Sequence, residues 1–243
     1  MAFPGNMPTP TALLFDIDGT LVDSTYLHID AWHQAFASVG HAVDAWRIHR
    51  AIGMDSTRLI ERLLGDDAAA LADRAKDEHQ RVYFASTWRL RAFDQATDLL
   101  RAVHERGVAV VLATSAPQRE LDALLDVLGA SDAIDVVTSG EDVKTAKPDP
   151  QVVEVALERA AVAAGSALLV GDAVWDIRAA SNAGVASVGV QSGGYGEEEL
   201  LAAGAIAVYE DAADVLAHLD DLPVVGPGAL HPDDETDERR GTT

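Results

Sequence analysis

Residues 13–24 read LLFDIDGTLVDS, and this stretch decides the fold that the rest of the chain completes. The apolar run of residues 12–15 is too short and too apolar for a surface element, so it predicts a buried parallel strand followed by a turn at Gly19. Asp16 and Asp18 stand two residues apart, so an extended backbone projects both carboxylates to the same side. Two such anions about 4 Å apart repel by roughly 4 kcal/mol at an effective dielectric of about 20. A cation, a shared proton or solvent must therefore relieve the repulsion between the two carboxylates at the tip of this strand.

The composition is that of an acidic globular chain. Its 243 residues carry a formal charge of −22, from 40 acidic and 18 basic side chains, and include no cysteine. Disulfides and thiolate metal sites are therefore excluded, and a basic surface for nucleic acid is not expected. No apolar run approaches the roughly 18 residues that cross a bilayer, and the N-terminus shows no secretory signal. We expect a cytoplasmic enzyme that engages neither nucleic acid nor membrane, while the oligomeric state is not readable from the sequence.

The region after the first strand has a helical pattern. From about residue 24 to residue 88, apolar residues recur at spacings of three and four, which predicts helices near 26–36, 59–64 and 67–84. Asp55 or Ser56 is a suitable cap for the second of these helices. No convincing strand interrupts this region. We therefore expect an all-helical domain inserted at residues 24–92.

From residue 93 onward, helix and strand patterns alternate. Strands are predicted at 108–113, 134–137, 167–170, 185–190 and 205–208, with helices at 94–106, 118–128, 150–164 and 175–182. This alternation predicts an α/β fold with a doubly wound, Rossmann-like parallel sheet. The core of that fold comprises residues 11–23 and 93–221. Residues 1–10 are expected to form a loose lead-in, and residues 222–243 a disordered tail rich in proline, glycine and charge.

Polar residues stand at the ends of several predicted strands. Thr114 and Ser115 end the strand at 108–113, and Asp172 follows the strand at 167–170. In open α/β sheets, ligands bind at the carboxyl ends of the strands. By itself a Thr-Ser pair at such a place is equally suited to cap the next helix. Lys147 is notable because the chain has only three lysines.

Asp176 extends this acidic set. It lies four residues after Asp172, one turn along the predicted helix, and therefore on the same face. A carboxylate in the first turn also favours the helix N-terminus, which is the simpler role for Asp176.

Together these segments resemble the four ordered motifs of the haloacid dehalogenase-like superfamily, most of whose members are magnesium-dependent phosphohydrolases. The matching segments are DIDGTLVDS at 16–24, Thr114, Lys147 in AKPDP, and GDAVWD at 171–176. The resemblance spans about residues 11–221. The helical insertion between the first two motifs is similar to the cap of the branch that contains phosphoglycolate phosphatases, sugar-phosphate phosphatases and β-phosphoglucomutase.

The resemblance implies a role for each motif residue. Asp16 matches the family's nucleophile and Asp18 its general acid/base. Phosphoryl oxygens are expected to be held by Gly19, Thr114, Ser115 and Lys147. A metal ion is expected on Asp16, Asp18, Asp172 and Asp176. Ligation by carboxylates, a backbone carbonyl and water selects a hard octahedral cation, hence Mg²⁺.

The implied activity is hydrolysis of a small-molecule phosphate ester through an aspartyl phosphate on Asp16. A dehalogenase lacks an aspartate at the place of Asp18. A phosphonatase needs a lysine in the cap, and Lys76 lies in the charged run DRAKDEH without apolar shielding. A non-catalytic phosphate-binding protein is disfavoured because none of the motif residues is lost.

A β-phosphoglucomutase-like phosphomutase is the main alternative. Such mutases anchor a distal phosphate with a cap arginine, whereas IGMDSTRL at 52–59 places Asp55 and Ser56 near that position. An acid there would repel a second phosphate, which favours the hydrolase. Cap residues that are candidates to contact substrate are His28, Arg47, Arg50 and Arg58.

Overall fold

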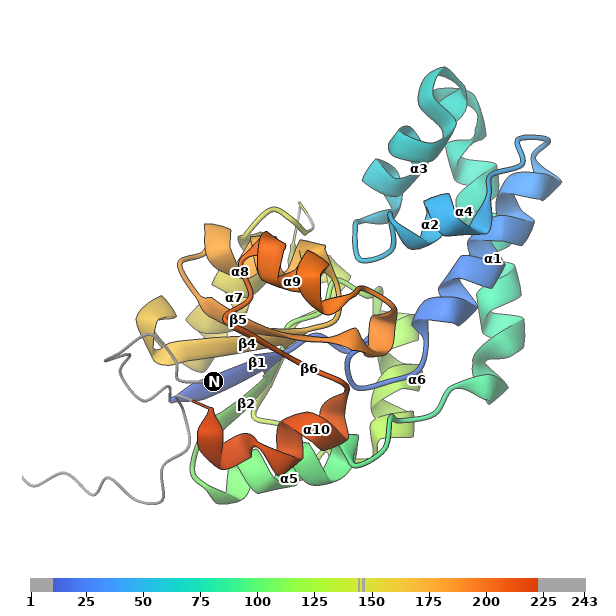
Figure 1. The fold of residues 1–243 in the computed structure, drawn as a ribbon. Coiled ribbons are helices and arrows are strands. Elements are labelled where there is room, and N and C mark those ends of the chain that lie inside the picture. Colours follow the sequence, from blue (N-terminus) through green and yellow to red (C-terminus); the bar gives the residue numbers. More distant parts are fainter. Residues whose placement is uncertain (1–10, 144, 146, 223–243) are drawn as a thin grey trace, which may run out of the picture.

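The computed structural model describes residues 11–143, 145 and 147–222. A six-stranded parallel sheet, in the order β3-β2-β1-β4-β5-β6, forms its centre. Four helices inserted after β1 form a cap beyond one end of the sheet (Figure 1). This is the α/β architecture with a helical insertion that the sequence predicts.

The strands are short and mostly buried, as expected for a parallel sheet covered on both faces. They span β1 Ala12–Phe15, β2 Ala109–Leu112, β3 Val136–Val137, β4 Ala167–Gly171, β5 Ala186–Val190 and β6 Ala207–Tyr209. β1 lies between β2 and β4, with Phe15 in register with Leu112 and Val170. The carboxyl ends of β1, β2 and β4 therefore lie side by side.

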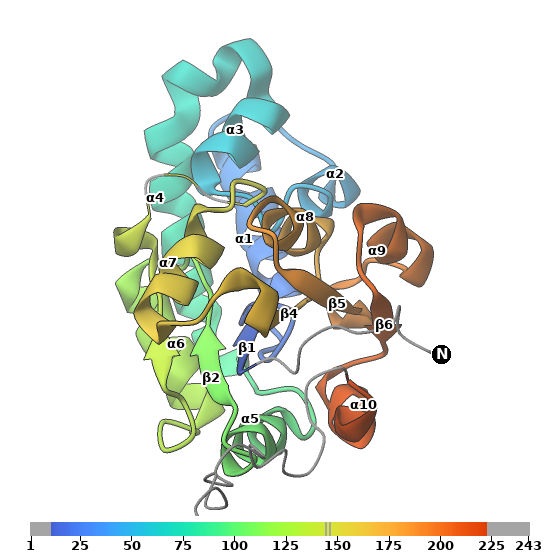
Figure 2. The same cartoon turned by 90° about the vertical axis from the view of Figure 1, so that its left-hand side faces the viewer.

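Alternating side chains of β1 serve two separate cores. Leu13 and Phe15 pack with helices α5 Ala96–Glu105, α6 Gln118–Leu128 and α10 Ala212–Ala217. Ala12 and Leu14 pack with helices α7 Gln151–Ala160 and α8 Val174–Asn182 on the opposite face. Figure 2 shows α5 and α10 together on one side of the sheet, with α7 and α8 on the other. This two-sided burial requires β1 to be apolar at every position.

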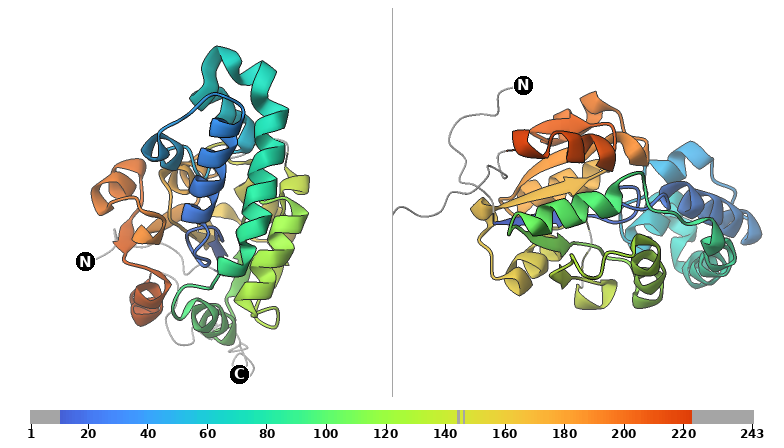
Figure 3. Two further views of the ribbon diagram at one scale, coloured as in Figure 1. Left: turned by 90° about the vertical axis from the view of Figure 1, so that its right-hand side faces the viewer. Right: turned by 90° about the horizontal axis from the view of Figure 1, so that it is seen from below.

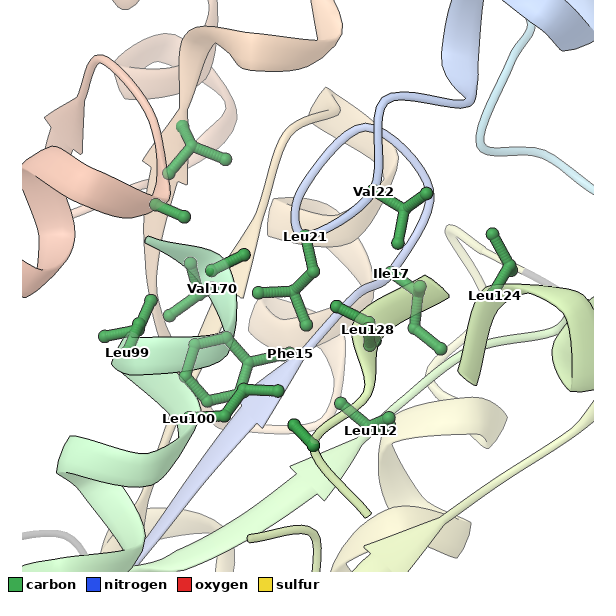
Figure 4. Close-up of a cluster of buried hydrophobic side chains, with 14 of the residues drawn as sticks. Phe15, Ile17, Leu21, Val22, Leu99, Leu100, Leu112, Leu124, Leu128 and Val170 are labelled. Carbon is green, nitrogen blue, oxygen red and sulfur yellow. The ribbon is translucent and has the colours of Figure 1, made fainter. Parts of the chain in front are cut away.

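The chain that follows β1 packs back onto the first of these cores. Figure 4 shows Ile17, Leu21 and Val22 turned toward the apolar side chains around Phe15. These apolar residues alternate with the polar ones of the motif. Burial of one set therefore fixes the loop that presents Asp16 and Asp18 at the sheet edge.

The cap consists of α1 Thr25–Ser38, α2 Ala45–His49, α3 Ser56–Leu64 and α4 Ala68–Ser86. α1 (blue) and α4 (teal) run side by side along their length (Figure 3). The cap has its own apolar core, in which Trp32 and Phe36 of α1 meet Ile60 and Leu63 of α3. The side chain of Asp55 caps α3 by accepting from the N–H groups of Thr57 and Arg58. The predicted cap residue is thus Asp55 and not Ser56.

Several predicted elements differ from those observed. The helix predicted at 150–164 ends at Ala160, because Ala161 takes a left-handed conformation with φ +55°. The strand predicted at 134–137 is reduced to Val136–Val137. The helices α2, α9 Glu197–Ala203 and α10 were not predicted. Each has at most seven residues, too few for an apolar period to stand out.

The predicted lead-in at 1–10 and the tail after Leu222 lie outside the described residues, as does Lys144. Within the described part of the chain, no helix has the length and apolar character to cross a membrane.

Candidate active site

Three carboxylates gather where the central strands end. Asp16 follows β1, Asp172 follows β4, and Asp176 lies in the first turn of α8. One oxygen from each lies within 4.8 Å of the others, and all three side chains are buried. The acidic residues that the sequence places at the ends of these two strands therefore lie together at one edge of the sheet.

Lys147 is the cation within this group. It is 3% exposed, and its Nζ bonds Asp16 and lies 2.7 Å from Oδ1 of Asp176. Burial opposes its charge, but the two carboxylates raise its pKa above the ordinary value. Lys147 is thus held as a cation, yet one positive charge does not neutralise three carboxylates.

Burial and the excess negative charge together raise the pKa values of two of these carboxyl groups. Burial, followed by the charges of Asp176 and Asp18, raises the pKa of Asp16 to about 7 despite the proximity of Lys147. Burial and the charges of Asp176 and Asp16 raise the pKa of Asp172 well above its ordinary value. Three buried carboxylates with one lysine suit a divalent cation with oxygen ligands, and Mg²⁺ fits this donor set.

Two glycines make room for Asp172. A Cβ on Gly193 would lie 1.6 Å from Oδ2 of Asp172, and a Cβ on Gly19 would lie 2.5 Å from the same atom. Gly19 also has φ +81°, a conformation that side chains rarely adopt. Thr20 donates to Oδ1 of Asp172 at 3.1 Å. Gly193 was missed in the sequence because its contact with Asp172 arises only in the folded chain.

Asp18 lies apart from the three-carboxylate group. Its Oδ1 accepts a hydrogen bond of 2.5 Å from Ser24 and lies 3.4 Å from Nε2 of His28. Burial opposes its charge, but the hydrogen bond and charge of His28, helped by Ser24, lower the pKa of Asp18. The general acid/base role of Asp18 and its part in metal binding both stay predictions.

His28 connects Asp18 to an aromatic stack in the cap. Burial opposes its charge, but Asp18 raises the pKa of His28. Its Nδ1 lies 3.2 Å from Nε2 of His79, and its ring stacks on Tyr83 with centroids 4.1 Å apart. Burial and the charge of His28 lower the pKa of His79 to about 2. Asp18 thus favours the protonated form of His28, whereas burial favours the neutral form of His79.

Thr114 and Ser115 line the cavity above these carboxylates. The hydroxyl of Thr114 accepts from the N–H of Ala116 at 3.0 Å, which is the capping role open to it in the sequence. A contact from this hydroxyl to a phosphoryl oxygen stays a prediction. The N–H of Gly19 donates to Val22, so the structure shows a conformational role for Gly19 and leaves its phosphate contact a prediction.

A cavity of about 240 Å³ lies between the sheet edge and the cap. Asp16, Asp18, Lys147 and Asp172 form its base. The cap contributes apolar and polar side chains, including His28, Trp32, Met54, Asp55, Ser56, Leu59, Lys76 and Gln80. The core adds Glu120 from the first turn of α6.

The candidate cap contacts separate into two groups. His28 reaches the cavity, whereas Arg50 pairs with Glu199 at 2.9 Å and Arg58 lies 3.8 Å from Asp55. Arg47 is exposed. Glu120 was not predicted as a site residue, although it follows Ser115 by five residues. Lys76 was considered only as the lysine that a phosphonatase would need. The scarcity of lysine in the chain was the feature that could have marked Lys76 as a site residue.

The comparisons with known proteins agree with this geometry. The model of the haloacid dehalogenase-like hydrolase family matches residues 13–190. A phosphoglycolate phosphatase of Rhodospirillum rubrum is 33% identical over 216 residues, covering 85% of this chain and 89% of the relative. A phosphorylated carbohydrates phosphatase of Thermotoga maritima is 30% identical, covering 82% and 94% respectively. The crystal structure of a hydrolase from Pseudomonas syringae superposes with a TM-score of 0.82 at 32% identity, covering 88% of this chain and 99% of that one.

The chain therefore belongs to the haloacid dehalogenase-like hydrolase family. Within the family it falls in the branch of phosphoglycolate phosphatases and β-phosphoglucomutases, and its homologues are phosphatases.

Proposed function

We propose that the protein is a Mg²⁺-dependent hydrolase of small phosphate monoesters that acts through an aspartyl phosphate on Asp16. The observation that carries this proposal is the convergence of Asp16, Lys147, Asp172 and Asp176 at one cavity between the sheet edge and the cap. The phosphatase relatives extend it to phosphoglycolate or phosphorylated carbohydrates as the substrate class.

Asp16 and Asp172 would hold the metal ion, with Asp176 beside them. When bound, Mg²⁺ supplies positive charge that offsets the carboxylates and the phosphoryl oxygens. Gly19 and Gly193 support this assignment because they leave room for the Asp172 carboxylate. Thr20 supports it by fixing one oxygen of that carboxylate.

The residues at the base of the cavity divide the reaction between them. A carboxylate oxygen of Asp16 attacks phosphorus, the bond to the leaving oxygen breaks, and Asp18 gives that oxygen a proton. Asp18 then removes a proton from water, which attacks phosphorus and releases phosphate and free Asp16. Lys147 lies against Asp16, where it stabilises negative charge that spreads over the phosphoryl oxygens.

Asp18 must bind a proton before it can donate one. His28 favours the charged carboxylate, whereas a dianionic phosphoryl group beside Asp18 raises its affinity for a proton. Arrival of the substrate therefore shifts Asp18 toward its acid form. The cap over the cavity excludes bulk water from this exchange.

The hydrolase is favoured over the mutase by the cap segment at 52–59. Asp55 and Ser56 line the cavity there, and Arg58 lies near the Asp55 carboxylate. A distal phosphate would therefore meet an acid. We expect β-glucose 1-phosphate, given with a trace of the bisphosphate and Mg²⁺, to yield little glucose 6-phosphate; its rapid formation without free phosphate would favour the mutase.

The direct test is hydrolysis of p-nitrophenyl phosphate and a panel of phosphate esters, with and without Mg²⁺. We expect release of inorganic phosphate that is lost with a chelator and restored by Mg²⁺. A lack of turnover across the panel, in protein shown to bind Mg²⁺, would favour a non-catalytic phosphate-binding protein.

A further inference from the structure

Lys76 is an unusual cation in this acidic protein. It lies on α4, lines the cavity, and donates from Nζ to the hydroxyl of Thr57 at 3.0 Å. Asp73 precedes it by one helical turn, yet Lys76 forms no ion pair with any described residue. Lys147, by contrast, is paired with two carboxylates. Lys76 thus keeps donor capacity free at the cap wall of the cavity.

Two acids also line this part of the cavity, and each has partners other than Lys76. Asp55 accepts from two N–H groups at the start of α3 and has Nε of Arg58 3.8 Å from its second oxygen. Glu120 is buried, and burial raises its pKa. Glu120 belongs to α6, and its electrostatic neighbours are His28 and Asp18. Neither acid pairs with Lys76.

The size of the cavity restricts what Lys76 can meet. Its volume of about 240 Å³ lies below the range of about 300–1,000 Å³ typical of sites for drug-sized ligands. After a phosphoryl group occupies the base, space remains for a leaving group of a few atoms. A single lysine matches one carboxylate, whereas a second dianionic phosphate would be left with unpaired charge.

We propose that Lys76 is a specificity-determining residue that binds a carboxylate on the leaving group, so that the preferred substrates are phosphate monoesters of short hydroxy acids. This inference rests on the proposed phosphatase function. The two ends of the substrate are then bound by different domains, the phosphoryl group by the core and the carboxylate by α4 of the cap. Thr57 supports the interaction by orienting the ammonium from α3.

The test compares 2-phosphoglycolate with 2-hydroxyethyl phosphate, in which a neutral hydroxymethyl group replaces the carboxylate. We expect Lys76→Met to lower kcat/KM for 2-phosphoglycolate by roughly 10- to 100-fold, mainly through KM, as for loss of a charged hydrogen bond. The same change should alter kcat/KM for 2-hydroxyethyl phosphate by less than about threefold. Lys76→Arg should restore part of the preference. Arg81→Met is the matched control, because Arg81 is an exposed cation on the same helix that pairs with Glu78.

The outcomes separate this inference from the function on which it rests. Equal losses on both esters in Lys76→Met would show a structural role, and an unchanged preference would show that the carboxylate binds elsewhere; either result overturns the inference. If the wild-type protein hydrolyses no ester, the proposed function fails. Calorimetric binding of the same two compounds to wild type and Lys76→Met, in the presence of Mg²⁺, then still decides the role of Lys76: weaker binding of 2-phosphoglycolate alone supports it, and any other pattern overturns it.

Discussion

The two walls of the cavity differ in how completely their polar groups are paired. On the core wall, Asp16 bonds Lys147, Asp172 accepts from Thr20, and Asp18 accepts from Ser24. On the cap wall, Lys76 has one neutral partner and stands among apolar side chains such as Met54 and Leu59. Groups that are already hydrogen-bonded are held in place before substrate arrives. A donor with unused N–H groups contributes most to binding when a ligand accepts a hydrogen bond from it. The difference agrees with the proposals that core residues carry the reaction and that Lys76 of the cap determines selectivity.

The largest effect is expected on the core wall from Asp16→Asn. An amide is a poor nucleophile, so turnover should fall by roughly 10⁴-fold or more, as for loss of a nucleophile elsewhere. The near-isosteric change should leave circular dichroism and the melting temperature close to those of the wild type. Retention of more than a trace of the wild-type rate, after repurification to remove contaminating phosphatases, would exclude Asp16 as the nucleophile.

The next effect concerns the metal. Mg²⁺ at about 100 times its Kd should stabilise the fold by about 2.7 kcal/mol, since it binds only the folded state. Asp172→Ala should abolish most of the Mg²⁺-dependent rise in melting temperature, because it removes a ligand from the buried group. Without metal, the same variant should be no less stable than wild type, since it relieves repulsion with Asp16 and Asp176. An undiminished response to Mg²⁺ would place the metal elsewhere.

Gly193→Ala tests whether the loop after β5 shapes the metal site. The added methyl would lie 1.6 Å from Oδ2 of Asp172, so the carboxylate or the loop must move. We expect Mg²⁺ affinity to fall by about 10- to 100-fold, as when other supporting groups of metal ligands are altered. Gly196→Ala is the matched control, because the nearest atom to its added methyl is 3.7 Å away. If both variants titrate with Mg²⁺ alike, Gly193 has no part in positioning Asp172.

The smallest effect is expected within the cap, from His79→Gln. Because the pKa of His79 is about 2 in the fold and about 6.5 when unfolded, the unfolded state binds more protons below about pH 6.5. Stability should therefore fall with decreasing pH in that range, by up to about 1.4 kcal/mol per pH unit from this group. His28 acts with the opposite sign, since its pKa is raised: its stabilisation is present at low pH and is lost as pH rises through the folded pKa.

Urea unfolding at about pH 7 and about pH 5.5 measures this effect. His79→Gln should flatten the loss of stability between the two, while His33→Gln, at an exposed position on α1, should leave it unchanged. Equal pH dependence in wild type and His79→Gln would mean that the pKa of His79 is the same in the folded and unfolded states.

Much of the core could be predicted because local patterns specify it. The run that forms β1 is apolar at each position, and the helix at 118–128 has apolar residues at helical spacing; the structure has both with the predicted bounds. The short helices α2 and α9 were not predicted, because they have too few residues to show an apolar period. Tertiary contacts determine where they form. The predicted end of a helix was wrong where a single residue, such as Ala161, takes a left-handed backbone conformation.

By itself, the sequence determined the α/β alternation, the helical insertion and the convergence of Asp16, Thr114 and Asp172. The physical reason is that apolar runs fix parallel strands, whose carboxyl ends must share one edge. Only the tertiary structure decided which side chains meet around the cavity. His28 meets Asp18 and His79, Gly193 meets Asp172, and Lys76 turns to Thr57 and the cavity instead of to Asp73. These pairings depend on how helices and loops pack against one another around the sheet edge, and no local period in the chain encodes that packing.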